Sequence, residues 1–538
     1  MEDLAMPIRN PQRREFLQLA GALAGASLLP GLTETSFAQG SGSKHLVVSL
    51  VPEPSGIYLL ANNPSLVVTL NVNDGLVTYD NDFKPVPQLA ESWTQSEDAK
   101  TITFKLRAGV KWHDGKPFTA ADVKFSVELT KKSSPVAAAT YAHLTAVETP
   151  DDLTVVLKFD HPSQALWAVL DGAKTQILPH HLYEGTDPNT NPWNNKPIGT
   201  GAFIFQEWVR GSHIRLTRNP DYWDKGKPLL DEITFRIIPD AGARGIALET
   251  GEVQYAPLPA IPLVEARRIR SKPGKLIAES RGWEANAPIY YFDFNLEREV
   301  FRDIRVRKAF AYAIDRKVLA NNGFFGFAKP ATGPVPSYQP NFYTPDTERY
   351  PYSVEKAEAL LEESGLRKDA QGIRLRVDNL PIPYGEDYVR TAQLIQQQLK
   401  RVGIDLQLRN FDVGTWITKI ARERDFDTLS TFGASFADPQ IGVYRRYWSK
   451  ARQTASGGNN SGYVSAEADK LIEASLIEGD VERRRSLIHE LQKLVESELP
   501  SISLLELEFV RILSADLAGA NVTPFGAFAS FTDLTFKA

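Results

Sequence analysis

Strand and helix patterns alternate along most of this 538-residue chain, and that alternation predicts an α/β fold. The clearest alternation is helix, strand, helix, strand over residues 353–364, 374–377, 386–402 and 404–408. Gly365 and Gly403 follow the two helices, where a glycine closes a helix in the left-handed conformation. A chain of this length is too long for one hydrophobic core, so about three or four structural units are expected.

Composition narrows the class of protein. Hydrophobic residues make up 42% of the chain and charged residues 24%, which is ordinary for a globular protein. The net charge of −5 offers no basic surface for nucleic acid. The chain has no cysteine, which excludes disulfides, thiolate metal sites, a cysteine nucleophile and the lipid-anchored cysteine of a bacterial lipoprotein.

The N-terminus has the pattern of an export signal. Arg13 and Arg14 precede Phe16-Leu17 and an apolar run over 19–32 that is too short to span a bilayer. Small residues at Ser36 and Ala38 suit a cleavage site after Ala38. Residues 1–38 are therefore predicted to be a twin-arginine signal; the alternative, an ordinary secretory leader, also exports the chain.

Gly75–Glu128 is the most regular stretch. Residues 101–106 alternate polar and apolar, as in a half-buried strand, and Asp114-Gly115 makes a turn. Thr119 stands where a helix N-cap is expected, with Asp122 three residues later as in a capping box. This stretch is predicted to be a strand, a turn and a helix.

Three stretches together resemble a known family. They are the signature TFKLRAGVKWHDGKPFTAADVKFS, the string GTGAF…NPDYW in 197–252 and FRDIRVRKAFAYAIDR in 301–316. Their order resembles family 5 extracytoplasmic solute-binding proteins, the receptors of ATP-binding-cassette (ABC) importers for peptides, nickel chelates, opines and some sugars. Gln254 departs from this pattern, since many members have an acid there.

The resemblance implies a two-lobed periplasmic-binding-protein fold of the Venus-flytrap type. It has mixed sheets flanked by helices and an extra subdomain inserted in the first lobe. On this chain, lobe I takes residues 44–74, 198–290 and 506–538, the inserted subdomain 75–197 and lobe II 291–505. The alternation of helices and strands in lobe II predicts a mostly parallel sheet there. Two crossings between the lobes predict a hinge that closes around a ligand.

Motifs for catalysis were not found. Gly199-Thr200-Gly201 lacks the third glycine of a dinucleotide fingerprint, and Ser353 of an SxxK string is predicted to be a helix cap. His180-His181 could ligate a metal but has no third ligand at a sensible spacing, so a surface loop or cap is favoured. We expect no catalytic residue, no metal ligand and no cofactor.

The ligand site is expected between the lobes. Residues 52–64 form a loop after the first core strand, and residues 426–439 form a strand that runs into a glycine-containing loop. Aromatic residues near these loops can stack on a ligand. The predicted ligand-binding residues are Asn62, Asn63, Tyr384, Trp416, Phe432, Gly433, Ser435 and Phe436.

Two charged groups of peptide-binding relatives are missing. Ser435 stands three residues after Phe432, where relatives carry an acid for the peptide's α-amine, and Ile382 replaces the arginine before Pro383-Tyr384 that holds a carboxylate. Because an unpaired buried charge is costly, a zwitterionic dipeptide is disfavoured. A neutral, cationic or sugar-like solute, or a peptide held through other residues, fits better. Glu386 and Asp387 are expected to stabilise the first turn of the helix over 386–402 through its dipole, in preference to contacting a ligand.

The predicted function is thus a monomeric periplasmic receptor. It captures a small solute or peptide and delivers it to an inner-membrane permease. The alternatives are a sensory or chaperone-like binder on the same fold and, with less support, a hydrolase. Ligand identity is not predicted.

Overall fold

The structure is a computed structural model that describes residues 44–537 apart from 59–62, 135–136, 258–259, 452–457, 521–522, 525 and 527–528. These residues belong to one compact unit. The predicted signal, residues 1–38, and Asn62 lie outside the described residues.

A seven-stranded mixed sheet brings the first strand of the chain, β1, together with a strand near its end, β19. Its order is β12-β19-β11-β1-β10-β9-β8, and β1 runs parallel to β10 and β11. The strands are β1 (His45–Leu50), β8 (Phe203–Val209), β9 (His213–Arg218), β10 (Glu232–Ile237), β11 (Tyr255–Ala256), β12 (Leu276–Glu279) and β19 (Arg511–Ser514). Its helices are α1 (Asn63–Val72), α5 (Ala241–Thr250) and α6 (Leu263–Ser271). Gly251 ends α5 in the left-handed conformation.

A four-stranded antiparallel sheet, in the order β4-β5-β7-β6, has its own apolar core. Its strands are β4 (Ala90–Gln95), β5 (Thr101–Leu106), β6 (Leu144–Asp151) and β7 (Thr154–Phe159). The helices beside it are α2 (Ala120–Ser133), α3 (Ala138–Tyr141), α4 (His180–Tyr183) and 3₁₀ turns at Gln164–Ala168 and Pro192–Asn194. The predicted strand over 101–106 is confirmed, because Ile102, Phe104 and Leu106 are all buried on one face.

The third sheet has six strands in the order β14-β18-β13-β17-β15-β16. They are β13 (Pro288–Phe294), β14 (Ala328–Pro330), β15 (Leu375–Pro381), β16 (Ile404–Leu408), β17 (Thr428–Ala434) and β18 (Ser501–Leu507). The prediction of a mostly parallel sheet is wrong. Only β15–β16 and β15–β17 pair in parallel, because β13 and β18, which connect to the seven-stranded sheet, run antiparallel to their neighbours.

Helices cover both faces of the six-stranded sheet. Tyr290, Phe292 and Phe294 of β13 face one side, whereas Tyr291 and Asp293 face the other. On the first side, Phe292 and Phe294 pack against Phe310 of α7 (Ile304–Ala313). The first face holds α7 (Ile304–Ala313), α8 (Arg316–Val318), α9 (Val354–Glu363), α10 (Glu386–Arg401), α11 (Val413–Thr418), a 3₁₀ turn at Glu299–Phe301 and π turns at Leu319–Gly323 and Lys419–Glu423. The second holds α12 (Pro439–Gly442), α13 (Tyr444–Tyr447), a 3₁₀ turn at Ser449–Ala451, α14 (Ala466–Ile477) and α15 (Val481–Glu498).

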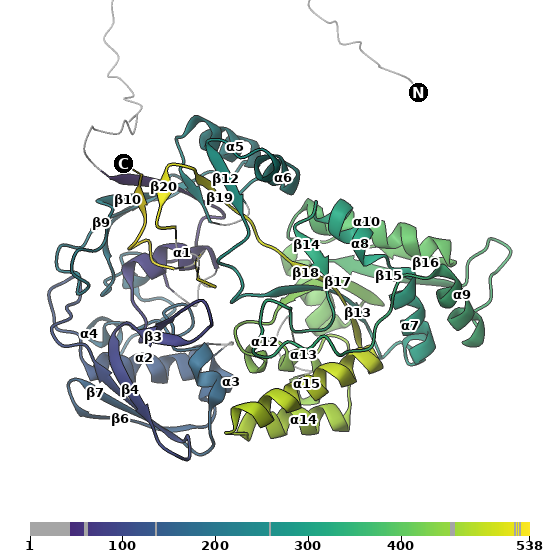
Figure 1. Ribbon diagram of the computed structural model, residues 1–538, viewed down its shortest axis with the longest axis horizontal. Helices are drawn as coiled ribbons and strands as arrows, with labels where there is room; N and C mark the ends of the chain where they lie inside the picture. The colour runs from purple at the N-terminus through teal and green to yellow at the C-terminus, as the bar shows by residue number, and fades with distance from the viewer. Residues whose placement is uncertain are drawn as a thin grey trace, which may run out of the picture. The chain divides into compact units, whose positions relative to one another are not determined.

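Two segments join the seven-stranded and six-stranded sheets. One leads from β12 to β13 and contains Trp283; the other, yellow in Figure 1, leads from β18 to β19 and contains Phe509. Two short strand pairs complete the fold: β2 (Val77–Tyr79) with β3 (Pro85–Pro87), and β20 (Leu517–Ala518) with β21 (Thr535–Phe536). The mixed α/β class is as predicted, whereas the residue boundaries assigned to the lobes remain a prediction.

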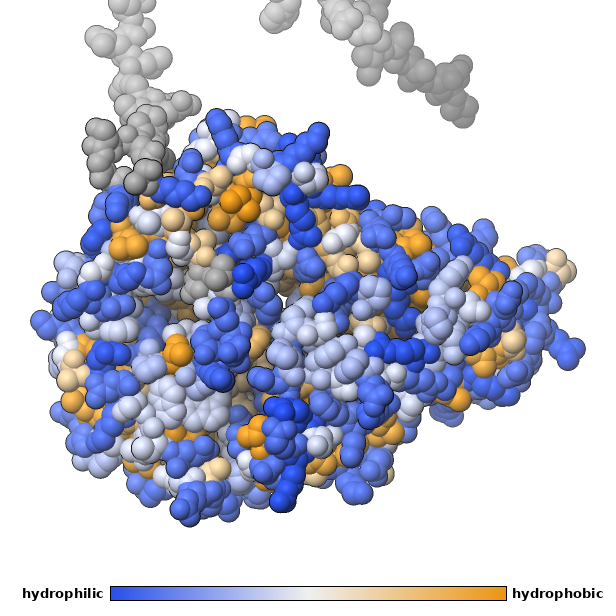
Figure 2. Space-filling model, in the orientation of Figure 1, coloured by the Kyte–Doolittle hydropathy of each residue, from blue (hydrophilic) through white to orange (hydrophobic). Residues whose placement is uncertain are grey.

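The surface is mostly polar. Figure 2 shows hydrophilic residues over most of the visible face, with apolar residues in small separate groups. Across the described residues, no helix combines the length and apolar character needed to cross a membrane.

Candidate functional site

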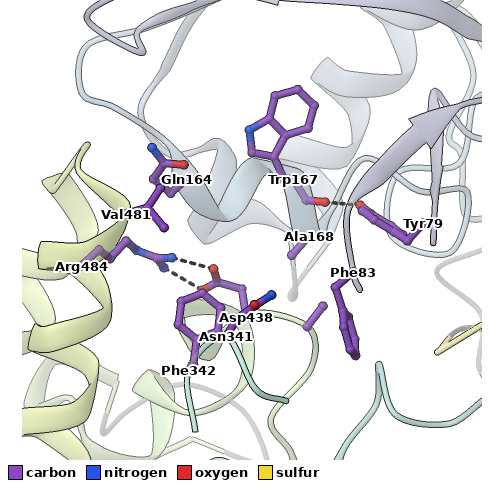
Figure 3. Close-up of a pocket in the computed structure, with 11 residues that line it drawn as sticks. Tyr79, Phe83, Gln164, Trp167, Ala168, Asn341, Phe342, Asp438, Val481 and Arg484 are labelled. Carbon is purple, nitrogen blue, oxygen red and sulfur yellow. Dashed lines mark hydrogen bonds and ion pairs between the residues drawn. The ribbon is translucent and has the colours of Figure 1, made fainter. Parts of the chain in front are cut away.

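A cavity of about 140 Å³, the junction pocket, lies between the four-stranded-sheet region and the helices behind the six-stranded sheet. Figure 3 shows that both regions contribute lining residues, with the Trp167 ring turned away from Asp438 and Arg484. Tyr79, Phe83, Gln164, Trp167 and Ala168 come from the former, and Asn341, Phe342, Ala437, Asp438, Val481 and Arg484 from the latter. The lining therefore combines aromatic residues from both regions with the amide side chains of Gln164 and Asn341.

A buried ion pair forms part of the wall. Both terminal nitrogens of Arg484 donate to the two carboxylate oxygens of Asp438 at 2.7 Å, and the two side chains are 4% and 5% exposed. Asp438 also caps α12 by accepting from the Gln440 amide at 2.9 Å. Such a pair is neutral and geometrically fixed, so it stabilises the end of the 426–439 segment and offers no charge to a ligand.

Just before this wall, an aromatic cluster marks the end of β17. The Phe432 ring stacks on Tyr388 at 5.6 Å and lies 5.9 Å from Tyr384 and 6.2 Å from Phe509. Tyr384 is 54% exposed, and Phe432 and Phe509 are partly buried. Stacking on flat solutes needs such part-open rings held in place by their neighbours.

The aromatic cluster reaches both connecting segments. Phe509 packs edge-on against Trp283 at 5.2 Å, so the two segments touch through these rings. Gln339 adds polar ties nearby, donating to the carbonyls of Glu284 at 3.3 Å and of Phe436. The site therefore adjoins the connection between the two large sheets.

Ser435 is held inside this network. Its side chain is buried, and its hydroxyl donates to Gln339 Oε1 at 2.9 Å. Phe436 follows with a φ of 53°, and its ring lies 5.3 Å from the Lys174 ammonium of the four-stranded-sheet region. The Phe432–Asp438 segment thus spans from the aromatic cluster to the junction pocket.

The remaining predicted residues have different surroundings. Trp416 is 5% exposed and donates from Nε1 to the Leu380 carbonyl at 3.3 Å, so it packs in the core instead of presenting a ring to a ligand. At Gly433 a Cβ would lie 3.3 Å from Tyr291 Cε2 and 3.4 Å from Arg446 Nη1, so glycine allows their close approach. Asn63 begins α1, and its side chain is outside the described structure, as is Asn62.

Sequence reasoning missed the buried cations around this segment. Arg446 pairs with Asp293 at 2.5 Å and lies 3.7 Å from the Tyr291 ring. Burial by itself would lower the pKa of Arg446, but Asp293, Tyr291 and Tyr447 together outweigh it and raise that pKa. Arg484, the partner of Asp438, was missed too. These partners are 153 and 46 residues apart, so no local spacing pointed to them.

The histidine pair has a structural setting. His180 Nδ1 lies 2.6 Å from Asp122 Oδ1, which also accepts from the His180 amide at 3.0 Å. Asp122, predicted as part of a capping box, accepts from the Thr119 amide at 2.9 Å and from Trp112 Nε1 at 3.3 Å. Asp122 is therefore an acid close to the histidine pair that the sequence spacing did not reveal. Its carboxylate already accepts hydrogen bonds that hold α2 and α4 together.

Two sheets joined by two touching segments, with part-open rings at the junction, are the architecture of a two-lobed binding protein. The family model for bacterial extracellular solute-binding proteins, family 5 Middle, matches residues 84–454. The chain belongs to this family of binding proteins, and its resemblance at the sequence level is confirmed.

Relatives agree with this assignment. The dipeptide-binding protein of Escherichia coli K12 is 28% identical over 465 residues, covering 82% of this chain and 84% of that protein. The ABC transporter substrate-binding protein CtaP of Listeria monocytogenes has a TM-score of 0.80 at 26% identity, covering 92% and 100% of the two chains. The PBP AgaA of A. tumefaciens R10, in complex with agropinic acid, has a TM-score of 0.75 at 27% identity, covering 92% and 99%.

Proposed function

We propose that this protein is the solute receptor of an ABC importer, binding its ligand at the junction and handing it to a membrane permease. The observation that carries the proposal is the placement of the part-open aromatic cluster and the junction pocket on either side of the Phe432–Asp438 segment. A ligand held there touches both halves and can favour a closed form by its differential affinity.

The proposed ligand contacts are Tyr384, Phe432, Phe436 and the backbone from Gly433 to Ala437. Trp416 is not among the proposed contacts, because its ring is buried in the core. With Ser435 bonded to Gln339, no carboxylate stands at the position that pairs with a peptide α-amine in relatives. A dipeptide held by its amine therefore remains disfavoured, while names of relatives extend the candidate solutes to peptides and opine-type acids.

Residues 1–38 are proposed as a cleaved twin-arginine signal, and the mature chain as a monomer of the periplasm. The lobe division given above is part of this proposal. This division is supported by the sheet topology. Strands β1, β8 to β12 and β19 form one sheet, and β13 to β18 form another.

Native mass spectrometry of the protein purified from the periplasm of its own organism tests the proposal. We expect one solute class at a 1:1 ratio, and small-angle scattering should show a smaller radius of gyration when that solute is added back to stripped protein. A single rigid form that retains no solute would contradict the function.

A further inference from the structure

The helical stretch formed by α12 and α13 carries two adjacent arginines with different surroundings. Val443 between the helices is itself helical, and its amide bonds to the Pro439 carbonyl at 2.8 Å. Residues four apart on this stretch therefore share a face. Ile441 is buried in the core of the four-stranded-sheet region, so Arg445, one turn later, starts from the same side of this stretch.

Charge is balanced at every other buried cation described beside this segment. Asp438 neutralises Arg484, and Asp293 neutralises Arg446. Arg445 differs, because its Nε is buried without a hydrogen-bond partner and no described carboxylate pairs with its guanidinium. Burial, with the neighbouring Arg446 cation, lowers the pKa of Arg445.

An unpaired, partly buried guanidinium is unfavourable in the empty protein. It is also a planar donor that matches the two oxygens of a carboxylate or phosphate. The Phe436 ring, one of the proposed ligand contacts, packs against the same core as Ile441, which lies one turn before Arg445. The side chain retains partial exposure, which leaves it open to a solute.

We propose that Arg445 binds an oxyanion group of the ligand, so that the solute class is anionic. This rests on the proposed function and deepens it. The arginine that is absent before Pro383-Tyr384 thus has a substitute on α13, on a different element of the fold. Arg446 and Arg484 are already neutralised by their own carboxylates. Lys174 beside Phe436 is a second cation, but its compact ammonium lacks the planar fork of a guanidinium.

The test uses ligand-stripped protein and two probes, sodium phosphate and sodium succinate at 50 mM, against sodium chloride at equal ionic strength. At least one oxyanion should raise the melting temperature of wild type by about 2 °C, since binding to the folded state alone stabilises it. Which salt acts distinguishes a phosphate-bearing from a carboxylate-bearing ligand.

Arg445→Met should abolish the rise, Arg445→Lys should keep part of it, and Arg422→Ala, at an exposed arginine, should leave it unchanged. Arg445→Met should also melt higher than wild type without oxyanion, a gain that a merely structural arginine would not give. An equal rise in Arg445→Met, or none in wild type, overturns the inference. If Arg445→Met fails to fold, an undiminished rise in Arg445→Lys, whose compact ammonium cannot form the fork, overturns it as well.

Failure of the proposed function would look different. If the co-purified solute is uncharged, or is retained equally by Arg445→Met, Arg445 is not its anchor and the receptor function stands. If no solute is retained and no closure occurs, the function itself fails.

Discussion

The Gly75–Glu128 module and the Phe432–Asp438 segment with its helix use polar side chains in opposite ways. In the module, Asp122 accepts from several nitrogens, and His113 accepts at Nδ1 from the Gly199 amide while Nε2 donates to the Gly201 carbonyl. Beside the second region, the Nε atom of Arg445 is buried with no hydrogen-bond partner among the residues that the structure describes. The module with the strongest family signal is therefore a scaffold, and the region that departs from the family pattern is where ligand choice is expected.

The largest expected effect breaks the buried pair at the junction pocket. Arg484→Ala leaves the Asp438 carboxylate buried and unpaired, and should lower the free energy of unfolding by about 3–5 kcal/mol. Urea denaturation measures this loss. Asp438→Asn/Arg484→Met, which removes both charges and keeps the cap, should lose far less; an equal loss would mean that packing, not charge, is at stake.

A pH effect should follow from His113. Burial lowers its pKa from 6.5 to about 4, so the folded state resists a proton that the unfolded chain accepts. Stability from this residue is full above pH 6.5 and falls by about 3 kcal/mol as the pH drops to 4 and below. Thermal melts of wild type and His113→Gln between pH 7 and 4 measure it. The variant should show a flatter profile, while His161→Gln, at an exposed histidine, should behave as wild type does.

Within the same module, Asp122→Ala removes the acceptor for the α2 cap and for His180. We expect a loss of about 2 kcal/mol in the free energy of unfolding. Affinity for the co-purified solute, measured by calorimetry at a temperature where the variant is folded, should stay within twofold. A large drop in affinity would contradict the division between scaffold and site.

The smallest effect concerns the exposed ring of the aromatic cluster. Tyr384→Ala should weaken binding of the co-purified solute about tenfold, or ~1.4 kcal/mol, with little change in stability. Tyr352→Ala, at another exposed tyrosine of the chain, is the matched control. Equal affinities for both variants would remove Tyr384 from the site.

Local patterns predicted much of the fold because they are determined by nearby residues. The 101–106 strand, the Thr119–Asp122 capping box and the Ser353 cap depend on spacings of a few residues, and the structure has all three. The parallel character of the six-stranded sheet was mispredicted because pairing of β13 with β17 and β18 joins strands more than 130 residues apart.

Site residues were harder to predict for the same reason. Phe432 and Tyr384 were proposed from their aromatic character and neighbouring loops, and the structure brings these two rings together, although their role in binding stays a prediction. Trp416 carries the same chemistry but packs under the sheet, which composition cannot reveal. Arg445 has a neighbour of the same type, Arg446, and only the position of Asp293 separates their roles.

The edge-on packing of Trp283 against Phe509 has a mechanical consequence. If the two connecting segments did not touch, the two halves could slide past each other as well as bend. Because Trp283 of one segment packs against Phe509 of the other, bending is expected to be the easier motion. A solute bound beside this ring contact, as proposed, would move little during bending, whereas atoms far from the contact would move over long distances. Small differences in how the solute fits near this contact would then be read out as large displacements at the rim that a permease would meet.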